Sequence, residues 1–219
     1  MCWNPDISIN TFLFSCLTLL FIYITNTYTK YKTPLFDNPI VYIFILSVVS
    51  MQLIEFFLWR NLKNKFINEY LSKLASFLFV LQPFFLMLLI PILKIRNTIL
   101  FFYLLFMAFY LIYKKIYSPI NFHTSVGKNG HLSWEFVNHK GYENIFTFIY
   151  LFFYISTVFF INNFLIALFL IPSFLISLFF YFRDNTFGTM WCWISNLFLL
   201  YFLVNILIVQ PYYEYNGLC

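Results

Sequence analysis

Residues Glu143–Phe182 read ENIFTFIYLFFYISTVFFINNFLIALFLIPSFLISLFFYF, an almost unbroken apolar segment of 40 residues. As one helix it would reach about 60 Å at about 1.5 Å per residue, twice the ~30 Å hydrocarbon core of a bilayer. The pair Asn162-Asn163 is its polar interruption, and asparagine accepts the left-handed backbone that a tight turn needs. The segment therefore predicts two membrane-crossing helices, 143–161 and 164–182, folded back on each other.

The composition of the whole chain agrees with this prediction. Hydrophobic residues make up 62% of the sequence and charged residues 10%, against about 45–50% and about 25% in soluble proteins. Further apolar runs near the ~20 residues that cross a bilayer lie at 7–24, 40–59, 71–93, 98–113 and 190–209. We expect an all-α integral membrane bundle of seven transmembrane helices, a single domain over residues 1–219, with the lipid bilayer as its partner.

The connections between the runs add local detail. Pro83 and Pro91 fall inside the third run, where each removes a backbone donor and is expected to bend the helix. The four-residue connection Lys94–Asn97 makes the third and fourth helices antiparallel neighbours. Within Ser125–Glu135, the turn Asn129-Gly130 is flanked by alternating residues, which predicts a short β-hairpin.

The distribution of basic residues predicts the orientation of the chain. Those on the side of the N-terminus are Arg60, Lys63, Lys65, Lys73, Lys114, Lys115, Lys128, Lys140 and Arg183, and those on the opposite side are Lys30, Lys32, Lys94 and Arg96. The positive-inside rule then places the N-terminus in the cytoplasm, although the first helix alone favours the reverse. The net charge of +5 is scattered, so we expect no nucleic-acid partner.

Polar residues inside the apolar runs are candidates for function. Glu55 is the carboxylate well inside a predicted helix, about 8 Å along the axis from Arg60, and Gln52 shares its helical stripe. The residues Gln82, Asn10 and Asn196 are expected at a similar depth. An intramembrane carboxylate must find a partner or take up a proton. The group is therefore either a polar pocket that binds or conducts a small ion, proton or lipid, or a hydrogen-bonded clasp between helices.

A second set of candidates gathers at the N-terminal side. The tryptophans expected there are Trp3, Trp59, Trp134, Trp191 and Trp193, and the histidines are His123, His131 and His139. Interfacial anchoring explains such tryptophans. The alternative is a membrane-embedded enzyme whose site uses His131, Trp134, Trp191, Cys192 and Trp193. The eight-residue histidine spacing is not typical of metal ligands, so no metal site is expected, and His131, Cys192 and Glu55 are the set to test. No catalytic motif or cofactor is indicated.

Five short motifs carry a resemblance over nearly the whole chain. They are MCWNP at 1–5, MQLIEFFLW at 51–59, QP at 82–83, GHLSW at 130–134 and MWCW at 190–193. Together they resemble an uncharacterised family of small multi-pass membrane proteins of large DNA viruses and protists. The resemblance implies an all-helical membrane fold and a viral or protist source, and it implies no activity. A third interpretation is a structural membrane scaffold in which the polar groups join helices.

Overall fold

The computed structural model describes residues 4–137, 144–161 and 163–217, and these fold into an all-α bundle. The long helices are α1 (Pro5–Tyr28), α2 (Pro39–Arg60), α3 (Lys65–Met87), α4 (Leu93–Ile116), α5 (Asn144–Phe160) and α6 (Phe164–Tyr181). A last 29-residue helix, Phe187–Tyr215, consists of α7 (Phe187–Ile194), α8 (Leu197–Val204), a π-helical turn (Asn205–Val209) and α9 (Gln210–Tyr215). Six of these seven segments are long and apolar enough to cross a membrane, and α5 is apolar but shorter. The predicted fold class is confirmed.

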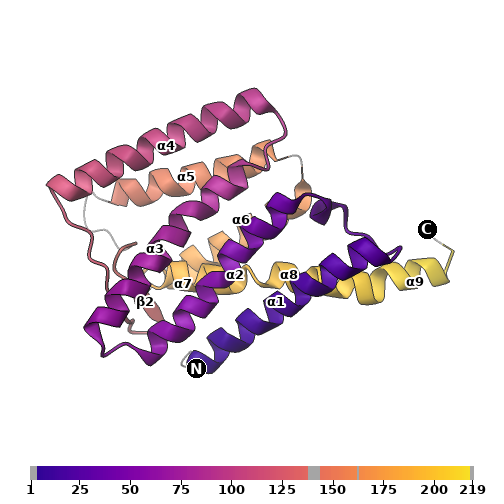
Figure 1. Cartoon of the computed structure of the whole chain (residues 1–219), viewed down its shortest axis with the longest axis horizontal. Coiled ribbons are helices and arrows are strands. Elements are labelled where there is room, and N and C mark those ends of the chain that lie inside the picture. Colours follow the sequence, from indigo (N-terminus) through magenta and orange to yellow (C-terminus); the bar gives the residue numbers. More distant parts are fainter. Residues whose placement is uncertain (1–3, 138–143, 162, 218–219) are drawn as a thin grey trace.

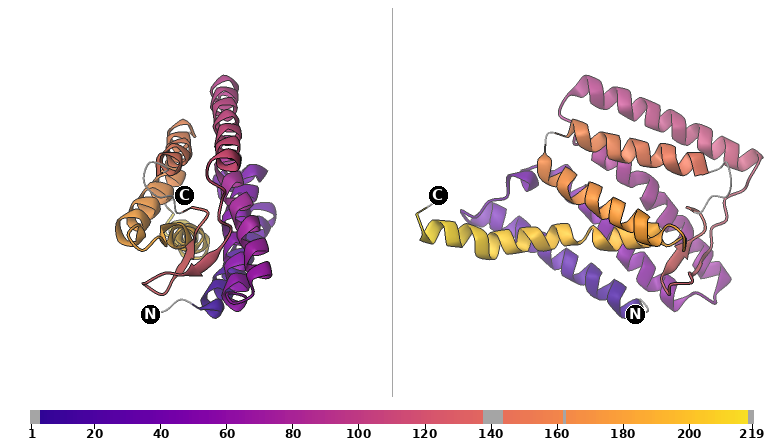
Figure 2. Two further views of the ribbon diagram at one scale, coloured as in Figure 1. Left: turned by 90° about the vertical axis from the view of Figure 1, so that its left-hand side faces the viewer. Right: turned by 180° about the vertical axis from the view of Figure 1, so that it is seen from behind.

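The helices form two layers that pack face to face (Figures 1 and 2). Helices α1 to α4 follow one another in the first layer, and α5, α6 and the α7–α9 segment form the second. Contacts of α1 with α8, α2 with α7, and α3 with α5 join the layers. Helix α1 begins and helix α9 ends at opposite ends of the bundle. We call the end at which α1 begins and α2 ends the N-terminal face.

Asparagine side chains start four of the helices. Asn4 and Asn38 each precede a proline at the first helical position, and Asn64 and Asn163 cap α3 and α6. Each side chain accepts a hydrogen bond from a free backbone N–H of the first turn, for example Ile67 N–H to Asn64 Oδ1 at 3.2 Å, which is the usual role of an N-cap. Asn163 thus ends the fold-back expected at Asn162-Asn163, while Asn162 lies outside the described residues.

Pro83 frees one backbone acceptor in α3, and two tyrosines donate to carbonyls at this point of the helix. The proline has no N–H to donate to the carbonyl of Phe79, four residues earlier. The Tyr150 hydroxyl from α5 donates to that carbonyl at 2.8 Å, and the Tyr103 hydroxyl from α4 donates to the next one, Val80 O, at 2.6 Å. Such compensation is needed because water is absent from a membrane interior. The proline and the two tyrosines therefore fix α4 and α5 against α3.

The third and fourth helices begin and end elsewhere than predicted. The expected third run, 71–93, corresponds to helix α3, which starts six residues earlier at Lys65 and ends at Met87. Pro91 thus lies in the connection and not inside a helix, and Lys94–Asn97 belongs to the first turn of α4. The expectation was wrong because the first turns of α3 are polar yet helical. Their buried members, Asn68 and Ser72, pack against the β-hairpin.

The predicted β-hairpin is present and caps the bundle at the N-terminal face. Strands β1 (Thr124–Val126) and β2 (Leu132–Trp134) pair antiparallel, and Gly130 in the turn takes a φ of 79°. Strand β1 contacts α3 and β2 contacts α7, so the hairpin bridges the two layers. All three residues of β2 are buried. Strand β2 therefore forms part of the core, while β1 and the turn are partly exposed.

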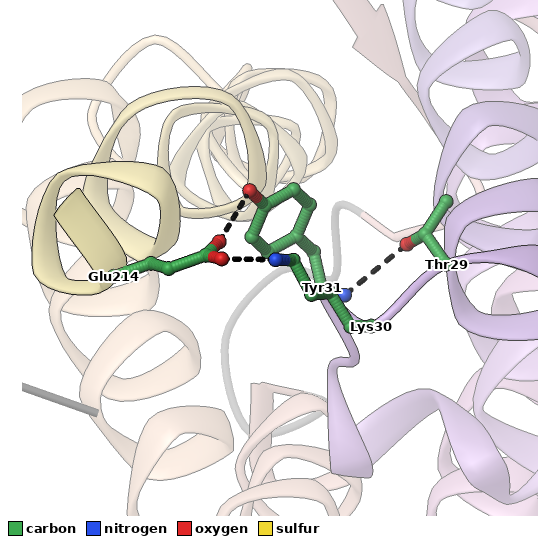
Figure 3. Close-up of polar contacts among 4 residues, drawn as sticks. All are labelled: Thr29, Lys30, Tyr31 and Glu214. Carbon is green, nitrogen blue, oxygen red and sulfur yellow. Dashed lines mark hydrogen bonds and ion pairs between the residues drawn. The ribbon is translucent and has the colours of Figure 1, made fainter.

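At the opposite end of the bundle, the last helix is joined to the loop that follows α1. The Glu214 carboxylate accepts a hydrogen bond from the Tyr31 hydroxyl at 2.7 Å and forms an ion pair with Lys30 (Figure 3). Tyr31 N–H in turn donates to Thr29 Oγ1 at 3.2 Å. All of these contacts are exposed, and exposed ion pairs contribute about 0–1 kcal/mol. They position the C-terminal turn without determining the fold.

Candidate functional site

A buried carboxylate lies between the two layers, near the N-terminal face. Glu55 is on the penultimate turn of α2 and is 3% exposed, and Gln52, one turn earlier, is 1% exposed. The two side chains lie against each other. Glu55 Oε1 and Gln52 Nε2 are both buried without a hydrogen-bond partner among the described residues. The predicted burial of this pair is thus what the structure shows.

Buried side chains from three other helices lie near Glu55 or near its neighbour Cys192. Cys192 of α7 lies within electrostatic range of Glu55 and beside the amide of Gln82 from α3. Tyr154 of α5 is an electrostatic neighbour of Cys192. All of these side chains are buried. We call Glu55, Gln52, Gln82, Cys192 and Tyr154 the polar pocket, to which α2, α3, α5 and α7 contribute.

No cation balances Glu55 within the described part of the chain. The ion pairs there are Lys30 with Glu214 and Lys73 with Glu69, both on the surface. Arg60, one turn beyond Glu55, places its guanidinium 4.5 Å from the ring centroid of Phe56. The carboxyl group is therefore held in an interior that supplies amide, thiol and phenol groups and no counter-ion among the residues described.

Gln82 and Asn196 also hold helices together. Gln82 Nε2 donates to Ser47 O of α2, across a long 3.5 Å. Ser15 of α1 donates to Asn196 Oδ1 at 2.5 Å, and Asn196 Nδ2 donates to Cys192 O at 2.8 Å. Asn196 is thus satisfied in a contact between α1 and the last helix. The clasp interpretation accounts for Asn196 and for part of the role of Gln82.

Asn10 does not join this group. It is exposed on α1, so the expectation that it lies with the other polar residues was wrong. The prediction rested on the depth of Asn10 along its helix, and depth does not determine the direction in which a side chain points.

Two residues near the polar pocket were not predicted. Tyr154 and Ser47 do not differ in pattern from the many other tyrosines and serines in the apolar runs. Cys192 was assigned to the tryptophan-rich face and instead points into the pocket.

Two of the tryptophans expected at the membrane surface lie in the core instead. Trp134 and Trp191 are each 2% exposed. Trp134 stacks on Phe136 and meets Phe79 edge-on, while the Trp191 indole donates to Ser173 Oγ at 3.2 Å. The expectation of interfacial anchoring is therefore wrong for these two residues, since they pack as core residues.

The other residues of the alternative enzyme site are also dispersed. Trp193 donates to Thr11 Oγ1 at 3.1 Å, on the α1 side of the bundle. His131 in the hairpin packs edge-on against Tyr181, with ring centroids 5.5 Å apart. Burial lowers the pKa of His131, and the nearby carboxylate of Asp184 opposes this effect.

The three candidate metal ligands, His131, Cys192 and Glu55, are not brought together either. Among the described residues, no group of three or more His, Cys, Asp or Glu could hold a metal ion. Cys192 lies by Glu55, whereas His131 is in the hairpin with Tyr181 as its ring neighbour. His139 lies outside the described residues. The arrangement can bind or transfer a proton at Glu55.

The fold and the polar pocket together define a multi-pass helical membrane bundle with a buried, uncompensated carboxyl group. Comparison with protein-family models, curated proteins and solved structures finds no match for the chain. The resemblance to membrane proteins of large DNA viruses and protists therefore stays an expectation.

Proposed function

We propose that the chain is a multi-pass membrane protein that takes up and moves a proton at Glu55. The observation that supports this is the buried Glu55 carboxyl oxygen that has no hydrogen-bond partner among the described residues. An isolated ionised carboxylate in an apolar interior costs far more than the neutral acid. Glu55 is therefore a group whose charge has to be neutralised by an incoming proton or cation.

The surroundings favour a proton over a metal cation. Calcium takes six to eight oxygen ligands and several carboxylates, and magnesium needs a near-ideal octahedron of oxygens. The polar pocket offers one carboxylate, two amides, a thiol and a phenol. These groups can donate or accept a proton through hydrogen bonds. This set of groups suits the binding of a proton better than the binding of a desolvated divalent ion.

The clasp interpretation keeps a share of the polar residues. The bonds of Gln82 to Ser47 and of Ser15 to Asn196 join helices, and a structural role for them is compatible with proton binding at Glu55. A clasp-only role for Glu55 itself predicts that its carboxyl bonds to another helix. The side-chain neighbour of this carboxyl is Gln52 of the same helix, and Glu55 Oε1 has no hydrogen-bond partner among the described residues. The experiment therefore has to distinguish proton transfer at Glu55 from a purely structural role in a membrane scaffold.

The orientation belongs to the same proposal. Arg60, Lys63, Lys65, Lys114 and Lys115 all lie at or near helix ends on the N-terminal face. The positive-inside rule puts this face in the cytoplasm. The polar pocket is then nearer the cytoplasmic than the opposite side, and the β-hairpin covers it from the cytoplasm.

The test is proton flux into liposomes that contain the purified chain. A potassium diffusion potential drives protons inward, and an internal pH dye records them. We expect wild-type protein to acidify the lumen, Glu55→Gln to fall to the rate of empty liposomes, and Glu69→Gln to keep the wild-type rate. Glu69 is a matched control because its carboxylate lies on the surface, paired with Lys73. The proposal fails if wild type conducts no protons, or if Glu55→Gln conducts as well as wild type.

Thermal unfolding in detergent separates a folding defect from a functional one. A neutral carboxyl and an amide have similar shape and polarity, so we expect Glu55→Gln to be about as stable as wild type. A clasp-only role predicts the reverse, a variant that loses stability of about 1–3 kcal/mol because a hydrogen-bonded partner is lost.

A further inference from the structure

An open groove runs between α4 and α5 at the end of the bundle opposite the N-terminal face. Its walls are mostly apolar and include Ile99 and Phe102 from α4 and Phe152 and Phe153 from α5. Phe102 is 53% exposed and Phe152 67% exposed. In Figure 1 the two helices lie side by side at one edge of the bundle. The groove therefore opens outward, where a membrane protein meets lipid, and not toward the polar pocket.

A basic group stands at the mouth of this groove. Lys94, in the first turn of α4, is one of the lining residues, and Arg96 is in the same turn, which contains no acidic residue. Neither side chain forms an ion pair within the described ranges. The positive charges of Lys94 and Arg96 interact unfavourably with the positive end of the helix dipole. An anion at this position would relieve that repulsion.

We propose that this groove, the lipid groove, binds one phospholipid molecule. Its phosphate contacts Lys94, the basic residue that lines the groove, and one acyl chain lies between α4 and α5 along Ile99 and Phe102. From Lys94 to Phe102 the helix rises about 12 Å at about 1.5 Å per residue, so the groove takes the part of the acyl chain nearest the headgroup. The positive charge at the mouth matches the phosphate of the headgroup, and the apolar walls below it match the acyl chain, which lies deeper in the bilayer.

A second copy of the chain fits the groove less well. Pairing through the same face about a two-fold axis along the membrane normal would bring the two basic starts of α4 together. Like charges would then face each other at the surface. A phospholipid brings the opposite charge instead, and each cation near an anionic headgroup contributes about 1 kcal/mol.

Native mass spectrometry of the delipidated full-length chain tests the proposal. The probes are phosphatidylglycerol, phosphatidylcholine and diacylglycerol with identical acyl chains. We expect one molecule of either phospholipid to bind and diacylglycerol to bind at least fivefold more weakly, because about 1 kcal/mol corresponds to about fivefold. Lys94→Gln should weaken phospholipid binding about fivefold. Lys32→Gln, on the same side of the bundle, should leave it unchanged.

A variant that fills the groove separates site binding from general attraction to lipid. Ser156 of α5 lines the groove and is partly exposed, so Ser156→Phe should abolish the single-lipid adduct while the melting temperature in detergent stays at the wild-type value. Equal binding by Lys94→Gln and wild type, diacylglycerol binding as tight as phospholipid, or a disulfide-linked dimer of Phe102→Cys would each overturn the proposal. None of these outcomes depends on proton flux at Glu55.

Discussion

The contact of Asn68 with Thr124 gives the most direct test of how the β-hairpin is held in the bundle. Asn68 Nδ2 donates to Thr124 O and Thr124 N–H donates to Asn68 Oδ1, both at 2.9 Å. Both residues, and the neighbouring Ser72, are fully buried. One amide side chain of α3 thus completes the backbone hydrogen bonds of a strand edge. The replacement Asn68→Ala removes both bonds and leaves two buried backbone groups without partners.

The size of the effect follows from these two groups. Leaving a buried donor or acceptor unsatisfied costs about 1–3 kcal/mol, so Asn68→Ala should destabilise hairpin docking by at least about 2 kcal/mol. Because about 1.4 kcal/mol is a factor of ten, the equilibrium constant for hairpin opening should rise roughly 30-fold.

Limited trypsin digestion measures this opening, because Lys128 lies in the turn of the hairpin. When opening and closing are fast relative to cleavage, the cleavage rate follows the population of the open form. We expect cleavage at Lys128 to accelerate roughly 30-fold in Asn68→Ala. The control is Asn64→Ala, which removes the N-cap of the same helix at a cost of about 1 kcal/mol and keeps both bonds to Thr124. If the two variants are cut at Lys128 equally fast, the hairpin is not held by Asn68.

Three further predictions concern the core and the hairpin. Tyr150→Phe should lower the free energy of unfolding by about 1–3 kcal/mol, because the carbonyl freed by the proline in α3 loses its donor; denaturant titration in detergent would show no change if that carbonyl were satisfied otherwise. A Cβ at Gly188 would lie 3.1 Å from the Trp134 ring, so Gly188→Leu should destabilise the protein by about 1–3 kcal/mol and shift the tryptophan emission to longer wavelength, whereas an unshifted spectrum would contradict this packing. Because burial lowers the pKa of His131 below its usual 6.5, the undocked hairpin binds more protons below about pH 6.5, and docking should weaken as the pH falls from that value. Cleavage of the hairpin by an acid-active protease should therefore rise with acidification in wild type and not in His131→Gln, and equal profiles would refute the linkage.

The parts of the fold that the sequence predicted are those dictated by length and turn chemistry. The apolar run of 40 residues had to fold back at Asn162-Asn163, and Asn129-Gly130 required a hairpin turn. Helix bounds were less accurate, because apolar runs were used to locate them. The N-cap Asn64 marks the start of α3 better than the start of the apolar run at residue 71 does. The polar turn that contains Asn68 is helical and is hydrogen-bonded to the hairpin.

The polar pocket was predictable in part for a similar reason. Glu55, Gln52 and Gln82 are rare polar residues in apolar runs, and burying them requires a shared interior. The rotation of each helix about its own axis is set by packing between the layers, which one sequence does not reveal. For that reason Asn10 was wrongly included, and Tyr154 was not recognised as a neighbour of Cys192 in the polar pocket.

The central claim is that Glu55 is a neutral, proton-carrying acid in a buried pocket that lacks a counter-ion among the described residues. Infrared spectroscopy of the protein in lipid at neutral pH tests this directly, because a protonated carboxyl has a carbonyl band that a carboxylate lacks. The account predicts such a band in wild type and in Glu69→Gln, and its loss in Glu55→Gln. An identical carbonyl region in wild type and Glu55→Gln would contradict it.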